Sequence, residues 1–93
     1  MPRVRLSGQL VCSDDAQLAL VEAHLPAHVA LTRAEPGCES FEVLQSADSL
    51  VWQVDELFAD EDAFARHQAR VAGSAWGHET AGIERRYEVV LEN

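Results

Sequence analysis

A few polar side chains occupy positions where the periodicity of strands and helices predicts apolar ones. Glu56 interrupts the inward-facing positions of one predicted strand, and Arg85 interrupts those of another. His67 lies between Phe64 and Val71 on the apolar stripe of a predicted helix. A histidine can take or give a proton near neutral pH, and a carboxyl–guanidinium pair can polarise or hold a ligand. These residues therefore suggest proton-transfer chemistry inside the fold.

Aromatic residues with polar tips are predicted to surround the same space. Trp52 and Tyr87 point inward from two strands, and Trp76 follows the second helix and could close one end. Gly8, on an intervening strand, would leave room for a ligand. Such a pocket would suit a flat, phenolic or quinol-like molecule. The structural alternatives remain open, because Glu56 and Arg85 could form a structural ion pair, and His67 and the aromatics could be core residues.

The chain must supply the elements that position these side chains. Alternating apolar residues predict four strands, over residues 4–12, 38–45, 50–58 and 83–91. A helix is predicted to begin at Asp14 and to end at Glu35, before Pro36 and Gly37. Its expected buried stripe is Leu18, Val21, Leu25, Val29 and Thr32, with His24 and His28 beside it, partly buried or solvated and without function. A second helix begins after Asp60, and residues 73–82 are less regular.

The order βαββαβ predicts a single α+β domain over residues 1–93, of the ferredoxin-like type. Right-handed crossovers give a four-stranded antiparallel sheet with both helices on one face, the third strand between the first two and the last beside the first. The opposite face has no helix to cover it. It is half apolar, carrying Val11, Leu44, Val51, Leu57 and Val90. An uncovered apolar face predicts a homodimer, sheet against sheet, of the dimeric α+β barrel type.

Composition excludes several classes of partner. Sixteen acidic and seven basic residues give a formal net charge of −9. Such a chain repels phosphate backbones and anionic lipid heads, so we expect it to bind no nucleic acid and no membrane. The first residues lack the apolar segment of a signal peptide, which favours a cytoplasmic protein. The two cysteines, Cys12 and Cys38, are predicted to lie too far apart for a disulfide.

No standard cofactor motif is present. The sequence contains no GxGxxG, P-loop, GxSxG or HExxH pattern. A metal site from His67, His78 and Glu56 is conceivable, but their spacing fits no standard pattern. We therefore expect no tightly bound cofactor.

Two stretches resemble the antibiotic biosynthesis monooxygenase (ABM) family. They are LTRAEPGC at residues 31–38, running into SFEV at residues 40–43, and FADEDAFARHQ at residues 58–68. The resemblance implies a homodimeric α+β barrel with a pocket between the sheet and the helices of each subunit. It also implies oxidation of phenols or quinols by O₂ without a metal or flavin, and His67 matches the family's helix histidine.

The sequence thus favours a cofactor-independent monooxygenase that acts on a small aromatic molecule. His67 would be the base or proton relay, Trp52, Trp76 and Tyr87 would form the pocket, and Glu56 and Arg85 would polarise it or position the substrate. One alternative is a non-catalytic dimeric-barrel protein that binds a small ligand or has a stress-related role. Another is haem binding or degradation. Some relatives degrade haem with a pocket asparagine, whereas the only asparagine here is Asn93.

Overall fold

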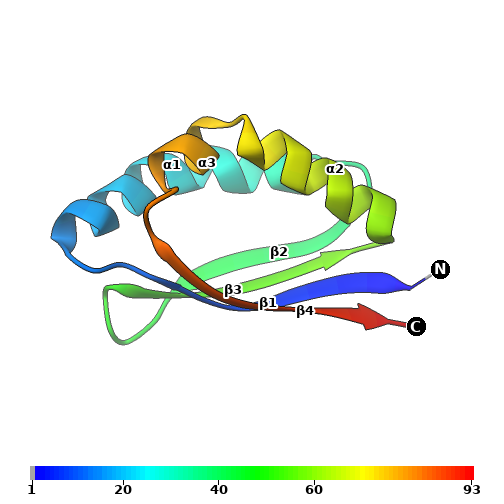
Figure 1. The fold of residues 1–93 in the computed structure, drawn as a ribbon, viewed down its shortest axis with the longest axis horizontal. Coiled ribbons are helices and arrows are strands. Elements are labelled where there is room, and N and C mark those ends of the chain that lie inside the picture. The colour runs from blue at the N-terminus through cyan, green and yellow to red at the C-terminus, as the bar shows by residue number, and fades with distance from the viewer. Residues whose placement is uncertain (1) are drawn as a thin grey trace.

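The structure, a computed structural model, describes residues 2–93. Its elements follow the order β1(Arg3–Val11), α1(Asp15–Arg33), β2(Cys38–Gln45), β3(Val51–Phe58), α2(Glu61–Ala72), α3(Ala75–Glu79) and β4(Glu84–Glu92). All the helices lie over one face of the sheet, and the opposite face carries none (Figure 1). The predicted ferredoxin-like α+β fold is confirmed, and the observed strand bounds differ from the predicted ones by one residue at most.

The four strands form one antiparallel sheet in the predicted order β2-β3-β1-β4. Gly8 of β1 lies opposite Val54 of β3 and opposite Tyr87 of β4, which fixes the register across the three strands. Because β3 is an interior strand covered by helices on one face only, its side chains alternate between buried and more accessible. The buried set on β3 is Trp52, Val54, Glu56 and Phe58.

Side-chain caps begin each helix. Asp14 accepts a hydrogen bond from the backbone of Gln17 and starts α1, and Asp60 accepts one from Ala63 and starts α2. The segment predicted to be irregular contains a third helix, α3, which starts because the hydroxyl of Ser74 accepts from the backbone of Gly77. This short helix places Trp76 over the sheet, where it is buried.

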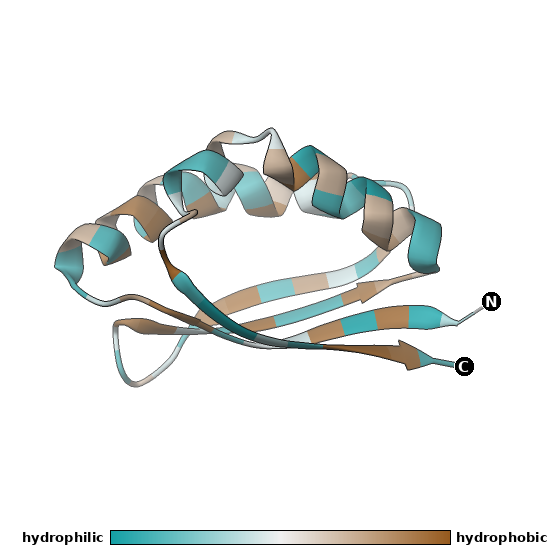
Figure 2. Ribbon diagram, viewed as in Figure 1, coloured by the Kyte–Doolittle hydropathy of each residue, from teal (hydrophilic) through white to brown (hydrophobic). Residues whose placement is uncertain are grey.

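Two details of the strands differ from expectation. Val89 and Leu91 alternate onto the inward face of β4, opposite Leu6 and Val4, yet they are about half exposed because β4 is an edge strand. Figure 2 shows that the end of β4 is hydrophobic. Gly8 does not leave free space as predicted. It has a φ of +149°, and a β-carbon there would collide with the backbone carbonyl of Arg86 on β4. Gly8 therefore permits close pairing of two strands.

The core lies between the sheet and the helices. Its buried hydrophobic residues include Leu6, Leu10, Cys12, Val21, Trp52, Val54, Trp76 and Ile83. Cys12 and Cys38 are both free thiols, as predicted. Among the helices of residues 2–93, none combines the length and apolar character needed to span a membrane.

Candidate functional site

A cavity of about 390 Å³ lies between the sheet and the helical layer. Every helix and every strand contributes to its walls. Most of the wall is apolar, and its chemically active side chains are His28, Glu56, His67, Trp76, Arg85 and Tyr87. A volume of this size suits a small organic molecule.

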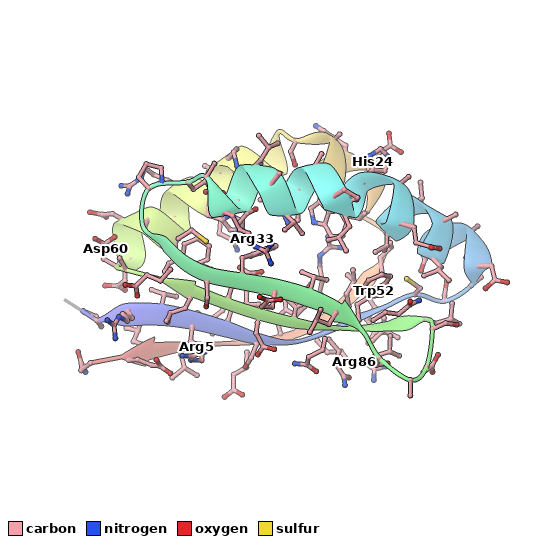
Figure 3. The ribbon with its side chains drawn as sticks, turned by 180° about the vertical axis from the view of Figure 1, so that it is seen from behind. Arg5, His24, Arg33, Trp52, Asp60 and Arg86 are labelled. Atoms are coloured by element: carbon pink, nitrogen blue, oxygen red, sulfur yellow. The ribbon has the colours of Figure 1, made fainter. Side chains whose placement is uncertain are left out.

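Five of the six predicted site residues meet at this cavity. His67 comes from α2, Trp76 from α3, Glu56 from β3, and Arg85 and Tyr87 from β4. The sixth, Trp52, belongs to the hydrophobic core and is not among the residues that line the cavity. Figure 3 shows Trp52 between the sheet and the helices. The structure therefore gives Trp52 a packing role beside the site.

His67 is held from the side away from the sheet. Its ring is 3% exposed, and its Nδ1 lies 2.9 Å from Oε1 of Glu35, just beyond the end of α1. Two nitrogens of Arg70 donate to the same carboxylate oxygen, at 3.1 and 2.9 Å, and Arg70 also donates to the hydroxyl of Thr32. Neighbouring α1 and α2 thus fix the orientation of the imidazole.

Glu56 approaches the other nitrogen of the same ring. Its Oε1 lies 3.7 Å from Nε2 of His67, and this buried oxygen has no hydrogen-bond partner among the described residues. Burial, and then the negative charge of Glu35, raises the pKa of Glu56 to about 7. Glu56 can therefore gain or lose a proton near neutral pH.

The predicted pairing of Glu56 with Arg85 is not formed. The Arg85 guanidinium instead donates to the backbone carbonyls of Thr80 and Ile83 and to the hydroxyl of Thr80. Arg85 is thus tied to the turn that follows α3, because the polar groups of that turn are closer than Glu56. It fixes this turn and still brings a positive charge to the wall of the cavity.

Tyr87 is a neutral phenol at the cavity wall. Burial raises the pKa of its hydroxyl to about 12. The positive charge of Arg85 acts in the opposite direction and the negative charge of Glu56 in the same one, and burial outweighs both. Tyr87 can therefore offer a hydrogen bond to a ligand without losing its own proton at neutral pH.

The sequence prediction gave no role in the site to His28, Glu35 or Arg70. His28 is 5% exposed, lines the cavity and stacks on Trp76 with ring centroids 4.6 Å apart. Burial, and then the charge on His67, lowers the pKa of His28 to about 3, so its ring is neutral. The expectation that His28 is solvated or only partly buried was wrong.

The sequence contained a signal for His28 and Glu35. Positions 21, 25, 28, 32 and 35 follow the spacing of one helical face. The observed buried residues of α1 are Val21, His28 and Thr32, so the buried stripe runs through His28 rather than Val29. This stripe leads directly to Glu35.

No group of three or more histidine, cysteine or acidic side chains in residues 2–93 is arranged to hold a metal ion. The pair of His67 and Glu56 lacks a third ligand of this kind. The arrangement that the structure does contain is a buried imidazole between two carboxyl groups, beside an apolar cavity.

Comparison with known proteins identifies relatives of this fold. A family model described as "Antibiotic biosynthesis monooxygenase" matches residues 12–77. Among curated proteins, none matches the chain.

Solved structures share the fold over nearly the whole chain. SnoaB, a cofactor-independent oxygenase from Streptomyces nogalater, has a TM-score of 0.71 at 17% identity, covering 97% of this chain and 92% of that chain. Rv0793 from Mycobacterium tuberculosis has a TM-score of 0.70 at 22% identity, covering 98% and 93%. A conserved protein from Methanosarcina mazei has a TM-score of 0.77 at 15% identity, covering 100% and 95%. These likenesses establish the common fold.

Proposed function

Because the chain belongs to the antibiotic biosynthesis monooxygenase family, we propose that it is a monooxygenase that oxidises a small phenol- or quinol-like molecule with O₂. The reaction would use neither a metal nor a flavin. The observation that supports this most directly is the placement of His67, a buried and oriented imidazole, at the wall of a largely apolar cavity. Such a site can remove a phenolic proton and exclude water from the resulting anion.

The reaction begins with the loss of the substrate's hydroxyl proton to the protein. The electron-rich anion then gives one electron to O₂, and the resulting radical and superoxide combine at a ring carbon. The peroxide anion takes back the proton held by the protein. Loss of water, which includes the hydrogen of the same ring carbon, leaves one oxygen atom in the product as a carbonyl. The protein contributes the proton acceptor, the orientation of the ring and the stabilisation of the anion.

The cavity walls suit an aromatic substrate. Trp76 and His28 present stacked, neutral rings, and Tyr87 offers a hydroxyl that stays protonated. Arg85 supplies a positive charge that would favour the deprotonated substrate over the neutral one. A flat ring bearing an acidic hydroxyl matches these features.

A homodimer is part of the same proposal. The face of the sheet opposite the helices carries Leu44 and Val90, which are 61% and 44% exposed. Arg5 and Arg86 also lie on that side of the sheet (Figure 3). Pairing two such faces would bury the apolar residues and leave the cavity, on the other side of each sheet, open to substrate.

Oxygen consumption by the metal-stripped protein tests the enzymatic proposal. We would compare wild type, His67→Ala and His78→Ala with a panel of quinols and phenols. His78 is exposed on α3 and serves as a matched control. We expect uptake by wild type and His78→Ala and a loss of at least about 100-fold in His67→Ala.

Absence of uptake above background across the panel would contradict the oxidation. Tight binding of a quinol by wild type and His67→Ala alike, without turnover, would favour the non-catalytic binding protein instead. Equal uptake by wild type and His67→Ala would remove His67 from the mechanism.

A further inference from the structure

A continuous line of polar groups runs from the helical layer to the central strand β3. It begins at Arg70, passes through the carboxylate of Glu35 and the ring of His67, and ends at the carboxyl of Glu56 beside the cavity. The contacts of Glu35 with Arg70 and with His67 are 3.1 Å or shorter, and the distance from Nε2 of His67 to Oε1 of Glu56 is 3.7 Å. Catalytic hydrogen bonds in ligand-free sites are often long and shorten when substrate binds.

The hydrogen bonds of Glu35 determine which nitrogen of His67 carries the proton. Oε1 of Glu35 already accepts from two nitrogens of Arg70, so this oxygen is an acceptor and not a protonated hydroxyl. Nδ1 of His67 must therefore donate to it. In the neutral ring, the lone pair is then on Nε2, which faces Glu56.

Glu56 is the member of this line that lacks a partner. Its side chain is 7% exposed, and Oε1, the oxygen nearest His67, accepts no hydrogen bond from any described residue. The nearest acidic charge is that of Glu35, just beyond α1, which Arg70 of α2 contacts on its other side, and the neutral ring of His28 lies on α1. Arg85 and Tyr87 face the same space from β4. None of these groups satisfies Oε1, so a proton shared with His67 or a substrate hydroxyl is the available partner.

We propose that Glu56 and His67 act as one proton-accepting pair, in which Glu56 takes the substrate proton and His67 stores it, and that Glu35 and Arg70 are the positioning residues of the pair. This inference rests on the proposed oxidation for its catalytic meaning, but the pair itself can be tested without turnover. It assigns the first proton transfer to Glu56 rather than to His67.

The proton step balances within the pair. The O–H bond of the substrate breaks, its electron pair stays on the substrate oxygen, and the proton joins the carboxylate of Glu56. The proton can then pass to the lone pair of Nε2, which makes His67 an imidazolium between two carboxylates. Glu35 stabilises this cation through its bond to Nδ1, so the substrate anion and the stored proton are kept apart.

NMR spectroscopy tests the pair in the absence of substrate. Long-range ¹H–¹⁵N spectra of wild type should show His67 protonated at Nδ1 and unprotonated at Nε2 when the ring is neutral. The side-chain carboxyl of Glu56 should titrate near 7. Glu35→Gln removes a negative charge that raises the pKa of Glu56, so its midpoint should move to lower pH, whereas Glu22→Gln, at an exposed position of α1, should not move it.

Steady-state oxygen uptake tests the role of the pair in the reaction. The rate of wild type should rise with pH through the midpoint at which Glu56 titrates. Glu35→Gln should move this rising limb of the pH–rate profile in the direction that NMR shows for the Glu56 midpoint. Glu56→Gln should lower kcat by about 100-fold and abolish the limb. A purely structural role would lower the rate without moving the limb.

The outcomes separate the two proposals. His67 protonated at Nε2, or a Glu56 midpoint that Glu35→Gln leaves unchanged, would overturn the pair. A Glu56→Gln variant with the kcat and pH profile of wild type would overturn the role of Glu56. If wild type consumes no oxygen with any quinol while the NMR results are as expected, the oxidation fails and the proton-sharing pair stands.

Discussion

At the scale of single residues, Glu56 should make the stability of the protein depend on pH. Its pKa rises from 4.5 to about 7 on folding. The folded protein therefore keeps a proton that the unfolded chain releases, so the contribution of Glu56 is complete below the lower value and is lost as pH rises through the upper one. Glu56→Gln abolishes this loss. As pH rises from 4 to 8, the unfolding free energy of the variant minus that of wild type should increase by at most roughly 3 kcal/mol.

Urea unfolding at several pH values measures this effect. Glu79→Gln, at an exposed position of α3, is the control and should follow wild type. If the difference between wild type and Glu56→Gln stays constant across the pH range, Glu56 does not hold a proton on folding.

His28 should have the opposite effect, because it is a base whose pKa falls from 6.5 to about 3 on folding. The contribution of His28 to the unfolding free energy is complete above the unfolded pKa of 6.5, and it is lost as pH falls toward the folded pKa of about 3. The slopes of His28 and Glu56 therefore oppose each other between about pH 4.5 and pH 6.5. In His28→Gln, the slope due to Glu56 should appear alone, as a fall of unfolding free energy with rising pH over this interval. A flat profile in the variant would contradict this account.

At the scale of elements, the pairing of β1 with β4 depends on Gly8. The residue has a positive φ, and an added β-carbon would meet the carbonyl of Arg86. We expect Gly8→Ala to lower the unfolding free energy by about 2 kcal/mol or more. Gly82 has no atom within 4 Å of the corresponding position, and it precedes β4 in the turn, so Gly82→Ala is the matched control. Equal denaturation midpoints for the two variants would show that β4 can move aside.

The elements themselves could be predicted from the sequence because local patterns determine them. Alternation fixed which face of β3 is buried, and Asp14 and Asp60 marked the helix starts. The position of Glu35 against His67 could not be read in this way. These residues are 32 positions apart, and Pro36 and Gly37 after Glu35 indicated only a helix end. Their contact depends on how α1 packs beside α2, which no local pattern encodes.

The same distinction explains the prediction for Arg85. Its inward position on β4 follows from alternation, and so does its presence at the cavity. The partner of Arg85 does not follow from alternation. The choice between Glu56 and the carbonyls of Thr80 and Ile83 depends on the path of the chain after α3. A pairing of opposite charges was the simplest expectation, and the turn supplied closer acceptors.

At the scale of the whole molecule, the helices cover one face of the sheet and leave the other bare (Figure 1). The cavity lies on the covered side, and the bare face exposes apolar side chains such as Leu44 and Val90. Dimerisation through the bare side would add buried apolar area to a small domain without covering the cavity. Stability and catalysis would then depend on opposite faces of one sheet.

This division predicts that charges on the bare face separate the subunits. Wild type should elute in size-exclusion chromatography with light scattering at twice the chain mass of 10.2 kDa, and Leu44→Lys/Val90→Lys at the mass of one chain. Leu31→Lys is the control, because Leu31 is 54% exposed on α1, on the other side of the molecule. The unfolding temperature of wild type should also rise with protein concentration, since a dimer is favoured by mass action. A monomeric wild type, or a double variant that remains dimeric, would place the contact between subunits elsewhere or remove it.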